Sequence, residues 1–352
     1  MRKMKQLLEC VPNFSEGRDM DIIRQIVSAI TSVEGVTLLN VDPGASANRT
    51  VVTFAGEADP VEEAAYRMAT AAASLIDMSR HHGTHPRIGA TDVLPLVPIS
   101  GITLEEAAAR ARRLAERMVR EGHIPSYCYE AAALRPQFAN LAVCRAGEYE
   151  GIASRWTDSE LGPDFRLTES EGGLERTLKT GVSVVGARNY LIAVNFNLNT
   201  KSTETASEIA CDVRERGRMV VTEGGERRRQ PGSLKGVKAI GWYIEEYGMA
   251  QVSMNITDMG LTPLHRAYEE VSRCATLRGV RVTGTEIIGL VPQVALTDAG
   301  CHFLGEEAKG KSREKLMECA IESMNLSQLR PFRVSEKVIE AVMAKGGIGG
   351  LS

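Results

Sequence analysis

The segments ATDVLPLVP (residues 90–98) and GTEIIGLVP (residues 284–292) align without a gap, although they lie in different halves of the chain. Both contain a threonine followed by an acidic residue, both end in Leu-Val-Pro, and each follows a strand-like stretch and a helix that begins at a proline. Chance similarity between two buried strands is the alternative interpretation, but the shared residues favour an internal duplication. The sequence therefore predicts an α+β fold made of two similar sandwiches of helices and a sheet.

Hydrophobic periodicity around these two segments predicts alternating strands and helices. In the first half we expect strands at 6–11, 36–41 and 50–54 and helices at 19–31, 60–76 and 103–121. In the second half we expect strands at 190–196, 237–243, 250–256 and 280–290 and helices at 203–216 and 263–277. Thr103, with acidic residues behind it, is a typical helix start, whereas Pro95 and Pro98 are expected to break the strand-like segment 88–99.

Polar stretches predict how the chain is divided. The segment 158–180 joins the halves and is long for a passive connection. We predict an N-terminal part (1–186), a C-terminal part (187–304) and a helical tail (305–352). A loop at 222–236 carries three consecutive arginines, 227–229, which form either a solvated surface or an electrostatic collar for a polyanionic substrate.

Composition excludes several classes of protein. The 352 residues are 43% hydrophobic and 25% charged with a formal net charge of −3, which is typical of a globular protein and not of a general nucleic-acid or membrane binder. Seven scattered cysteines without a CxxC pair indicate reduced thiols. The N-terminus lacks an apolar stretch long enough for a signal peptide, and we expect a cytoplasmic protein.

Three of the six histidines fall within the segment HHGTHPR, residues 81–87. Histidine carries protons near neutral pH, and Gly83 and Pro86 favour a turn that presents side chains to a cleft. His81 and His82 directly follow a helix, where they also fit a helix-capping role. His85 lies in the turn itself and is the better candidate for acid/base catalysis.

A metal site is the competing interpretation of the histidines, because His81 and His85 are four residues apart. Gly83 and Pro86 argue against a continuous helix here, and there is no HExxH motif or second histidine or cysteine cluster. The sequence also lacks GxSxG, a P-loop and a well-placed GxGxxG. We therefore expect neither a metal nor a nucleotide cofactor.

Two polar positions nearby are further candidates. Asp42 is expected to end a strand at Pro-Gly, where it either meets substrate or forms an Asx-turn with its own backbone. Asn48-Arg49 follows, and the arginine either binds a carboxylate or forms an ion pair at the strand edge.

The chain resembles the glutamate formimidoyltransferase family, the transferase part of formimidoyltransferase-cyclodeaminase. The matching strings, in order, are ECVPNFSEG (9–17), NRT (48–50), DMSRHHG (77–83), HPR (85–87), GA (89–90) with Asp92, RAGEYE (145–150), PDF (163–165), GAR (186–188), Asn195, QVS (251–253) and GLVP (289–292). The likeness spans residues 6 to 304.

The resemblance implies two ferredoxin-like subdomains related by duplication, a homodimer, and transfer of the formimidoyl group from N-formimidoyl-L-glutamate to tetrahydrofolate in histidine degradation. It implies His85 as the catalytic acid/base and folate contacts in the segment 166–181, which is longer and more charged here than in the family. We expect no cyclodeaminase module, because the tail after residue 304 is too short for one. Our site prediction comprises Asp42 beside His85 for catalysis and, for binding substrate and folate, His82, Arg87, Asn48, Arg49, Arg166, Gly181, Arg188 and Asn195.

Three more functions are compatible with the residues alone. A formyl transfer on the same scaffold differs from formimidoyl transfer only by an oxygen in place of an NH. The second is a non-catalytic folate-binding protein, and the third is a metal-dependent hydrolase. The second-half arginines fit a folate that carries one or more glutamate carboxylates.

Overall fold

The computed structural model describes residues 6–45, 47–83, 86–221 and 225–346. The chain forms two compact units: unit 1 comprises residues 1–188 and 346–352, and unit 2 comprises residues 189–345. Both units combine helices with a sheet, and the predicted α+β class is confirmed. Among the described residues, no helix has the length and apolar character needed to cross a membrane.

Unit 1 contains a seven-stranded sheet with the order β3-β4-(β1, β2)-β5-β7-β6, in which β1 and β2 both lie between β4 and β5. Pairing is antiparallel from β3 to β5 and parallel from β5 through β7 to β6. The strands are β1 (Leu7–Cys10), β2 (Asn13–Phe14), β3 (Val36–Gly44), β4 (Arg49–Glu57), β5 (Thr91–Ser100), β6 (Ser126–Glu130) and β7 (Ser183–Ala187). Strands β6 and β7 have no counterpart among the strands expected from the sequence.

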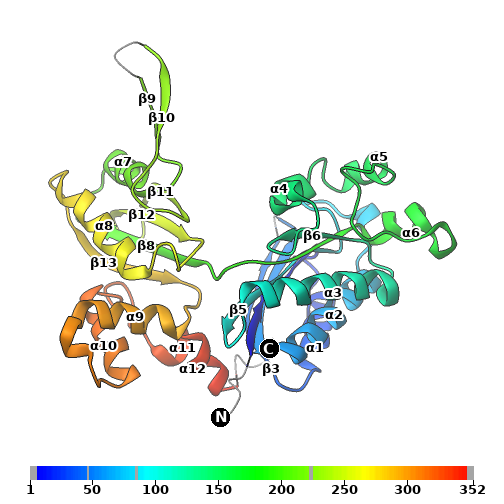
Figure 1. Cartoon of the computed structure of the whole chain (residues 1–352), viewed down its shortest axis with the longest axis horizontal. Coiled ribbons are helices and arrows are strands. Elements are labelled where there is room, and N and C mark those ends of the chain that lie inside the picture. Colours follow the sequence, from blue (N-terminus) through cyan, green and yellow to red (C-terminus); the bar gives the residue numbers. More distant parts are fainter. Residues whose placement is uncertain (1–5, 46, 84–85, 222–224, 347–352) are drawn as a thin grey trace. The chain divides into compact units, whose positions relative to one another are not determined.

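Helices cover both faces of this sheet. The long helices α1 (Met20–Thr31), α2 (Ala58–Leu75) and α3 (Leu104–Gly122) lie together on one face, where they bury the main core (Figure 1). A smaller core covers the parallel strands on the other face. It is contributed by η2 (Pro136–Ala139), α4 (Leu141–Cys144), η3 (Tyr149–Gly151), α5 (Ile152–Arg155) and α6 (Gly173–Thr180), and η4 (Glu169–Glu171) leads into α6. Thus the segment 158–180, expected to be a connection, folds largely as part of unit 1.

Local chemistry explains where the long helices begin. Asp19 caps α1 by accepting hydrogen bonds from the backbone of Asp21 and Ile22. Thr103 and Glu106 form a reciprocal capping box at the start of α3, which confirms the predicted helix start.

The expected break at Pro95 and Pro98 is wrong, because β5 runs through both prolines. Pro95 accepts a hydrogen bond from the backbone of Val11, so its own nitrogen faces the gap between β1 and β2, where no ladder bond is lost. Pro98 lies where the pairing of β5 with β1 shifts register, and a bulge also tolerates a proline.

Unit 2 contains a four-stranded antiparallel sheet with the order β11-β12-β8-β13. Its strands are β8 (Ile192–Leu198), β11 (Val237–Ile244), β12 (Met249–Ile256) and β13 (Val282–Ile288), packed against α7 (Thr203–Val213) and α8 (Leu264–Thr276). The chain continues into α9 (Gln293–Leu304), η5 (Gly305–Ala308), α10 (Arg313–Ser323), α11 (Val334–Lys337) and α12 (Ile339–Ala344). An isolated bridge between Val291 and Val338 ties the end of the chain to this unit.

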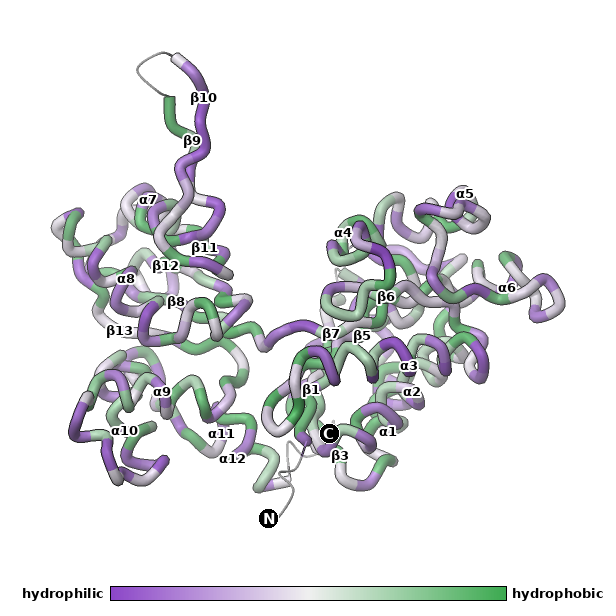
Figure 2. The backbone as a smooth tube through the Cα atoms, in the orientation of Figure 1, coloured by the Kyte–Doolittle hydropathy of each residue, from purple (hydrophilic) through white to green (hydrophobic). Residues whose placement is uncertain are grey.

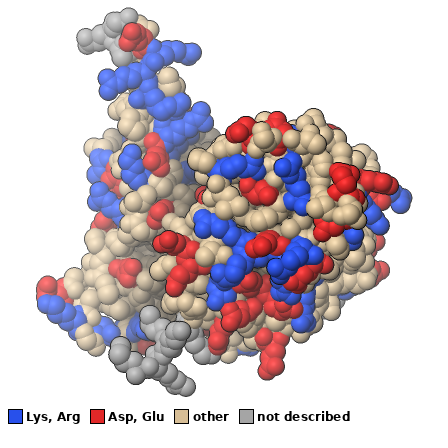
Figure 3. Space-filling view, turned by 45° about the vertical axis from the view of Figure 1, so that its right-hand side comes forward, with Lys and Arg blue, Asp and Glu red and all other residues tan. Residues whose placement is uncertain are grey.

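The arginine triplet lies in a β-hairpin, so the prediction of a loop at 222–236 is wrong for these residues. The helix that was expected to reach residue 216 ends at Val213. Strands β9 (Arg218–Val221) and β10 (Arg227–Gln230) pair only with each other. Figure 2 shows hydrophobic β9 beside hydrophilic β10, and Figure 3 shows the basic side chains gathered along this arm. Both strands are largely exposed. The sequence therefore shows no alternation of apolar and polar residues from which these two strands could be predicted.

Candidate functional site

The histidine segment lies in unit 1 between the short helix η1 (Met78–Arg80) and β5. His85, the predicted acid/base, lies outside the described residues, as does Thr84. The residues on either side of them are described, and their contacts define the surroundings of the segment.

His81 is buried and structural in its contacts. Its Nε2 lies 2.8 Å from the carbonyl oxygen of Asn48, and its buried Nδ1 has no hydrogen-bond partner among the described residues. Burial lowers the pKa of His81, so the neutral imidazole is favoured. His82 is exposed, which leaves its imidazole available to a ligand.

Asn48 joins three of the motifs found in the sequence. Its side-chain oxygen accepts a hydrogen bond from the backbone of Gly17 (3.0 Å), and its side-chain nitrogen donates to the carbonyl oxygen of His82 (3.0 Å). The residue has φ 49, a left-handed conformation that asparagine adopts more readily than most residues. Gly83 packs beside it, since a Cβ there would lie 2.1 Å from the carbonyl oxygen of Ala47. Asn48 therefore holds the histidine segment, whereas a ligand-binding role was predicted for it.

Arg87 is 8% exposed and binds two acidic residues of the string RAGEYE. Its terminal nitrogens donate to both carboxylate oxygens of Glu150 at 2.8 and 2.7 Å, and Nη1 also reaches Oε2 of Glu148 at 3.3 Å. The guanidinium lowers the pKa of Glu150 to about 2, so this carboxylate stays ionised. Arg87 thus forms its ion pairs with the protein's own acids, and its Nη2 also donates to the carbonyl oxygen of His81 at 3.3 Å.

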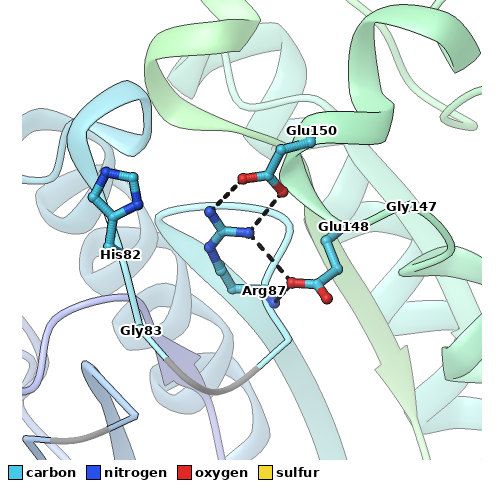
Figure 4. A pocket seen from close by; sticks show the side chains of 6 residues that line it. All are labelled: His82, Gly83, Arg87, Gly147, Glu148 and Glu150. Carbon is cyan, nitrogen blue, oxygen red and sulfur yellow. Dashed lines mark hydrogen bonds and ion pairs between the residues drawn. The ribbon is translucent and has the colours of Figure 1, made fainter.

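These residues surround a pocket of about 460 Å³, lined by His82, Gly83, Arg87, Gly147, Glu148 and Glu150. Figure 4 shows the His82 imidazole on one side and the two glutamates on the other, with the Arg87 side chain between them. An imidazole, a guanidinium and two carboxylates at one pocket suit proton transfer and the binding of a polar, charged substrate. Gly83 and Arg87, which precede and follow Thr84 and His85 in the sequence, both line the pocket.

Asp92, part of the threonine-acid pair in the duplicated segment, fixes the chain beyond the histidines. It is fully buried, accepts a hydrogen bond from the backbone of Ile88 (3.0 Å), and forms an ion pair with Arg145. The sequence strings contained Asp92, Arg145, Glu148 and Glu150, but our site prediction gave them no role. Asp92 pairs with Arg145, and Glu148 and Glu150 pair with Arg87. The partners are more than fifty positions apart, so no local sequence pattern indicates these contacts.

Gly181 forms an isolated bridge with Gly89, which lies two residues after the end of the histidine segment. It has φ 68, and a Cβ there would lie 2.3 Å from the carbonyl oxygen of Ile88, so only glycine fits. Arg166, at the other end of the predicted folate segment, is exposed and donates to the carbonyl oxygen of Trp156 at 2.5 Å. Gly181 therefore lies beside the histidine segment, whereas the described contact of Arg166 is with Trp156.

Asp42 and Arg49 lie on neighbouring strands close to this cluster. Asp42 is exposed within β3, which continues to Gly44, so the expectation that Asp42 ends its strand is wrong. The strand is longer because β4 pairs with it as far as Arg49. Burial lowers the pKa of Arg49, and the charges of Asp92 and Asp42 oppose this effect.

Arg188 lies beside β5, farther along the strand, within unit 1, and Asn195 belongs to unit 2. The backbone of Arg188 bonds to Leu96, seven positions along the chain from Gly89, or roughly 23 Å in an extended strand. There its charge opposes the effect of burial on Glu9, whose pKa rises to about 7. Asn195 belongs to unit 2, is 5% exposed, and donates to Glu286 at 3.1 Å.

No group of three or more histidine, cysteine, aspartate or glutamate side chains suited to a metal ion is present in the described part of the chain.

Comparison with known proteins gives the following matches. A family model described as formiminotransferase domain, N-terminal subdomain, matches residues 7–188, and one described as formiminotransferase domain matches residues 193–344. The chain is 39% identical to the glutamate formimidoyltransferase of Streptococcus pyogenes serotype M1, over 86% of this chain and 95% of that protein. The corresponding protein of Thermoplasma acidophilum is 38% identical, over 89% and 98%.

The longer relatives include the formimidoyltransferase-cyclodeaminase of Sus scrofa, which is 41% identical over 98% of this chain. The chain spans 61% of the length of that relative.

Proposed function

The chain belongs to the formiminotransferase family, and from this premise we propose that it is a folate-dependent glutamate formimidoyltransferase. It transfers the formimidoyl group of N-formimidoyl-L-glutamate to tetrahydrofolate, as a step of histidine degradation. The observation that carries this proposal is the pocket beside the histidine segment, where His82, Arg87 and two carboxylates meet. Similarity to two glutamate formimidoyltransferases over nearly their whole length supports it.

The reaction needs one proton moved between two nitrogens, and we assign this task to His85. A folate amine attacks the formimidoyl carbon and forms a new C–N bond, giving a tetrahedral adduct. His85 takes the proton that the attacking nitrogen loses and returns it to the glutamate nitrogen. The bond from carbon to that nitrogen then breaks with its electron pair on nitrogen, releasing glutamate. Asp42 orients the imidazole or stabilises the charged centre.

The remaining predicted residues divide between positioning and binding. Asn48 and Arg87 position the histidine segment through the contacts described above. His82 is proposed to bind substrate at the pocket. Arg49, at the start of β4, is proposed to bind it from next to Asn48, and Gly181 allows the folate segment to approach the histidine segment. Arg166, Arg188 and Asn195 stay proposed folate contacts, with the exposed arginines of β10 as an electrostatic collar for the glutamate carboxylates of folate.

We also propose that both units derive from one duplicated ferredoxin-like unit. In each, a strand–helix–strand–strand–helix–strand sequence forms a sheet in which the second, third, first and fourth strands are neighbours in that order. The segments 90–98 and 284–292 overlap the fourth strand in both. From the family resemblance, we further propose a cytoplasmic homodimer.

Replacing His85 tests the mechanism. In His85→Ala, kcat with N-formimidoyl-L-glutamate and tetrahydrofolate should fall by about 100- to 10,000-fold, because the proton carrier is lost. Steady-state turnover measures kcat, and fluorescence titration should show unchanged tetrahydrofolate binding. His302→Ala, an exposed histidine of α9, is the matched control. Near-normal turnover by a normally folded His85→Ala protein would show that another group moves the proton.

A further inference from the structure

The charges at the pocket are unequal in number. Two carboxylates, Glu148 and Glu150, face one guanidinium, Arg87, so the three groups carry a formal charge of −1 together. Glu150 uses both oxygens on Arg87, one on each terminal nitrogen. Glu148 uses only Oε2, which accepts from the backbone nitrogen and Nη1 of Arg87 at 3.4 and 3.3 Å.

The second oxygen of Glu148 is therefore available to a ligand. Among the described residues Oε1 of Glu148 accepts no hydrogen bond, and the side chain is 43% exposed at the pocket. Glu148 also has φ 54, and its backbone nitrogen bonds to the carbonyl oxygen of Arg145 at 2.8 Å. The acceptor is thus held by the backbone turn on one side and by Arg87 on the other (Figure 4).

A cation with N–H donors is the ligand that such an acceptor prefers, because a hydrogen bond between two charged groups is about twice as strong as one between neutral groups. The formimidoyl group is an amidine. Amidines are strong bases and carry a positive charge, spread over two nitrogens in one plane, at neutral pH. An N-formyl group at the same position is a neutral amide.

We infer that Glu148 binds the cationic formimidoyl group of the donor through Oε1, and that this contact makes the site select a formimidoyl donor over a formyl donor. The inference rests on the proposed function and names the residue that sets its donor specificity. Arg87 and Glu150 position Glu148, since together they occupy its other oxygen and fix its direction.

The charge along the reaction supports this role. A protonated formimidoyl donor and a neutral folate amine give an adduct with one positive charge, and the products are a formimidoyl-folate cation and neutral glutamate amine. The reacting centre thus keeps a charge of +1 from start to finish, and Glu148 is its counterion throughout. A formyl donor instead gives an adduct with a negatively charged oxygen, which the carboxylate repels.

The test compares two donors on the wild type, Glu148→Gln and Glu148→Asp. Glutamine keeps an oxygen acceptor of the same reach but removes the charge. With N-formimidoyl-L-glutamate, kcat/KM of Glu148→Gln should fall roughly 10- to 150-fold, the range for losing a hydrogen bond to a charged group. With N-formyl-L-glutamate it should stay level or rise, and Glu148→Asp should recover part of the preference. Glu116→Gln, an exposed glutamate of α3, is the matched control.

The outcomes separate this inference from the proposed function. If the wild type turns over neither donor, the proposed function fails. If the wild type transfers the formimidoyl group but Glu148→Gln keeps the wild-type ratio between donors, the inference alone is overturned. Equal loss with both donors also overturns it, because a merely structural role predicts that result. Unfolding midpoints and tetrahydrofolate affinity, measured on each variant, show whether the fold and the acceptor site are intact.

Discussion

At the scale of single residues, the histidine segment is held by hydrogen bonds and ion pairs that link it to other motifs of the sequence. Asn48, Arg87 and Asp92 each bond to the backbone or side chains of a different sequence motif. Asn48 does so from a left-handed backbone conformation, which costs an L-residue roughly 1–2 kcal/mol and which glycine adopts freely.

Substitution of Asn48 separates the contribution of its two hydrogen bonds from that of its left-handed backbone conformation. Asn48→Ala should lower the free energy of unfolding by about 2–4 kcal/mol, from two lost hydrogen bonds and the backbone strain. Asn48→Gly loses the same bonds without the strain and should be about 1 kcal/mol more stable than Asn48→Ala. Urea unfolding measures both. Asn325→Ala, at another left-handed asparagine, should leave turnover unchanged; equal stability of the glycine and alanine variants of Asn48 would contradict the strain argument.

At the scale of elements, the sequence predicted those whose burial is periodic. The helices α1 and α3 were predicted from apolar spacing and from their caps, and each begins within a residue of the predicted position. Strand β7 is buried at every position, and a short strand that is buried on both faces shows no alternation of apolar and polar residues to reveal it. The roles of Glu148 and Glu150 escaped prediction for a different reason, since they depend on tertiary contact with Arg87.

The β9–β10 hairpin has little tertiary support, because its two strands pair with each other and not with either larger sheet. An isolated two-stranded hairpin is only marginally stable, and its arginines at 227–229 are all exposed. Trypsin should therefore cut first after one of these arginines, while both sheets stay folded. Timed digestion with mass spectrometry of the fragments locates the cut. The triple replacement of residues 227–229 by glutamine should delay it; a first cut within 166–180 would contradict the expectation.

At the scale of the whole molecule, each unit contains a histidine whose Nδ1 is buried and has no hydrogen-bond partner among the described residues: the buried His81 in unit 1 and the half-buried His265 in unit 2. Burial lowers the pKa of both below the ordinary value of 6.5. At these two positions the unfolded chain therefore binds more protons than the folded one as the pH falls, whereas Glu9, with its raised pKa, acts in the opposite direction. The stability that these neutral imidazoles contribute is complete above about pH 6.5 and is lost progressively below it.

His265→Gln isolates the contribution of one histidine. As the pH falls from about 7 to about 5.5, the urea midpoint of this variant should rise relative to that of the wild type, because one group that binds protons more readily in the unfolded chain is removed. Asn325→Ala, which removes no ionisable group, is the control and should keep a constant difference from the wild type. Circular dichroism at each pH gives the midpoints. A difference between His265→Gln and the wild type that does not change over this range would mean that His265 titrates alike in the folded and unfolded chains.

The bridge between Gly89 and Gly181 has a consequence for the order of folding. It closes a loop of about ninety residues, and the contact of Arg87 with Glu150 spans much of the same stretch. Contacts between residues so distant along the chain form slowly, because the entropy of closing the loop is lost before the contact stabilises anything. During synthesis, the histidine segment leaves the ribosome long before Glu148, Glu150 and Gly181, so the pocket is among the last parts of unit 1 to assemble.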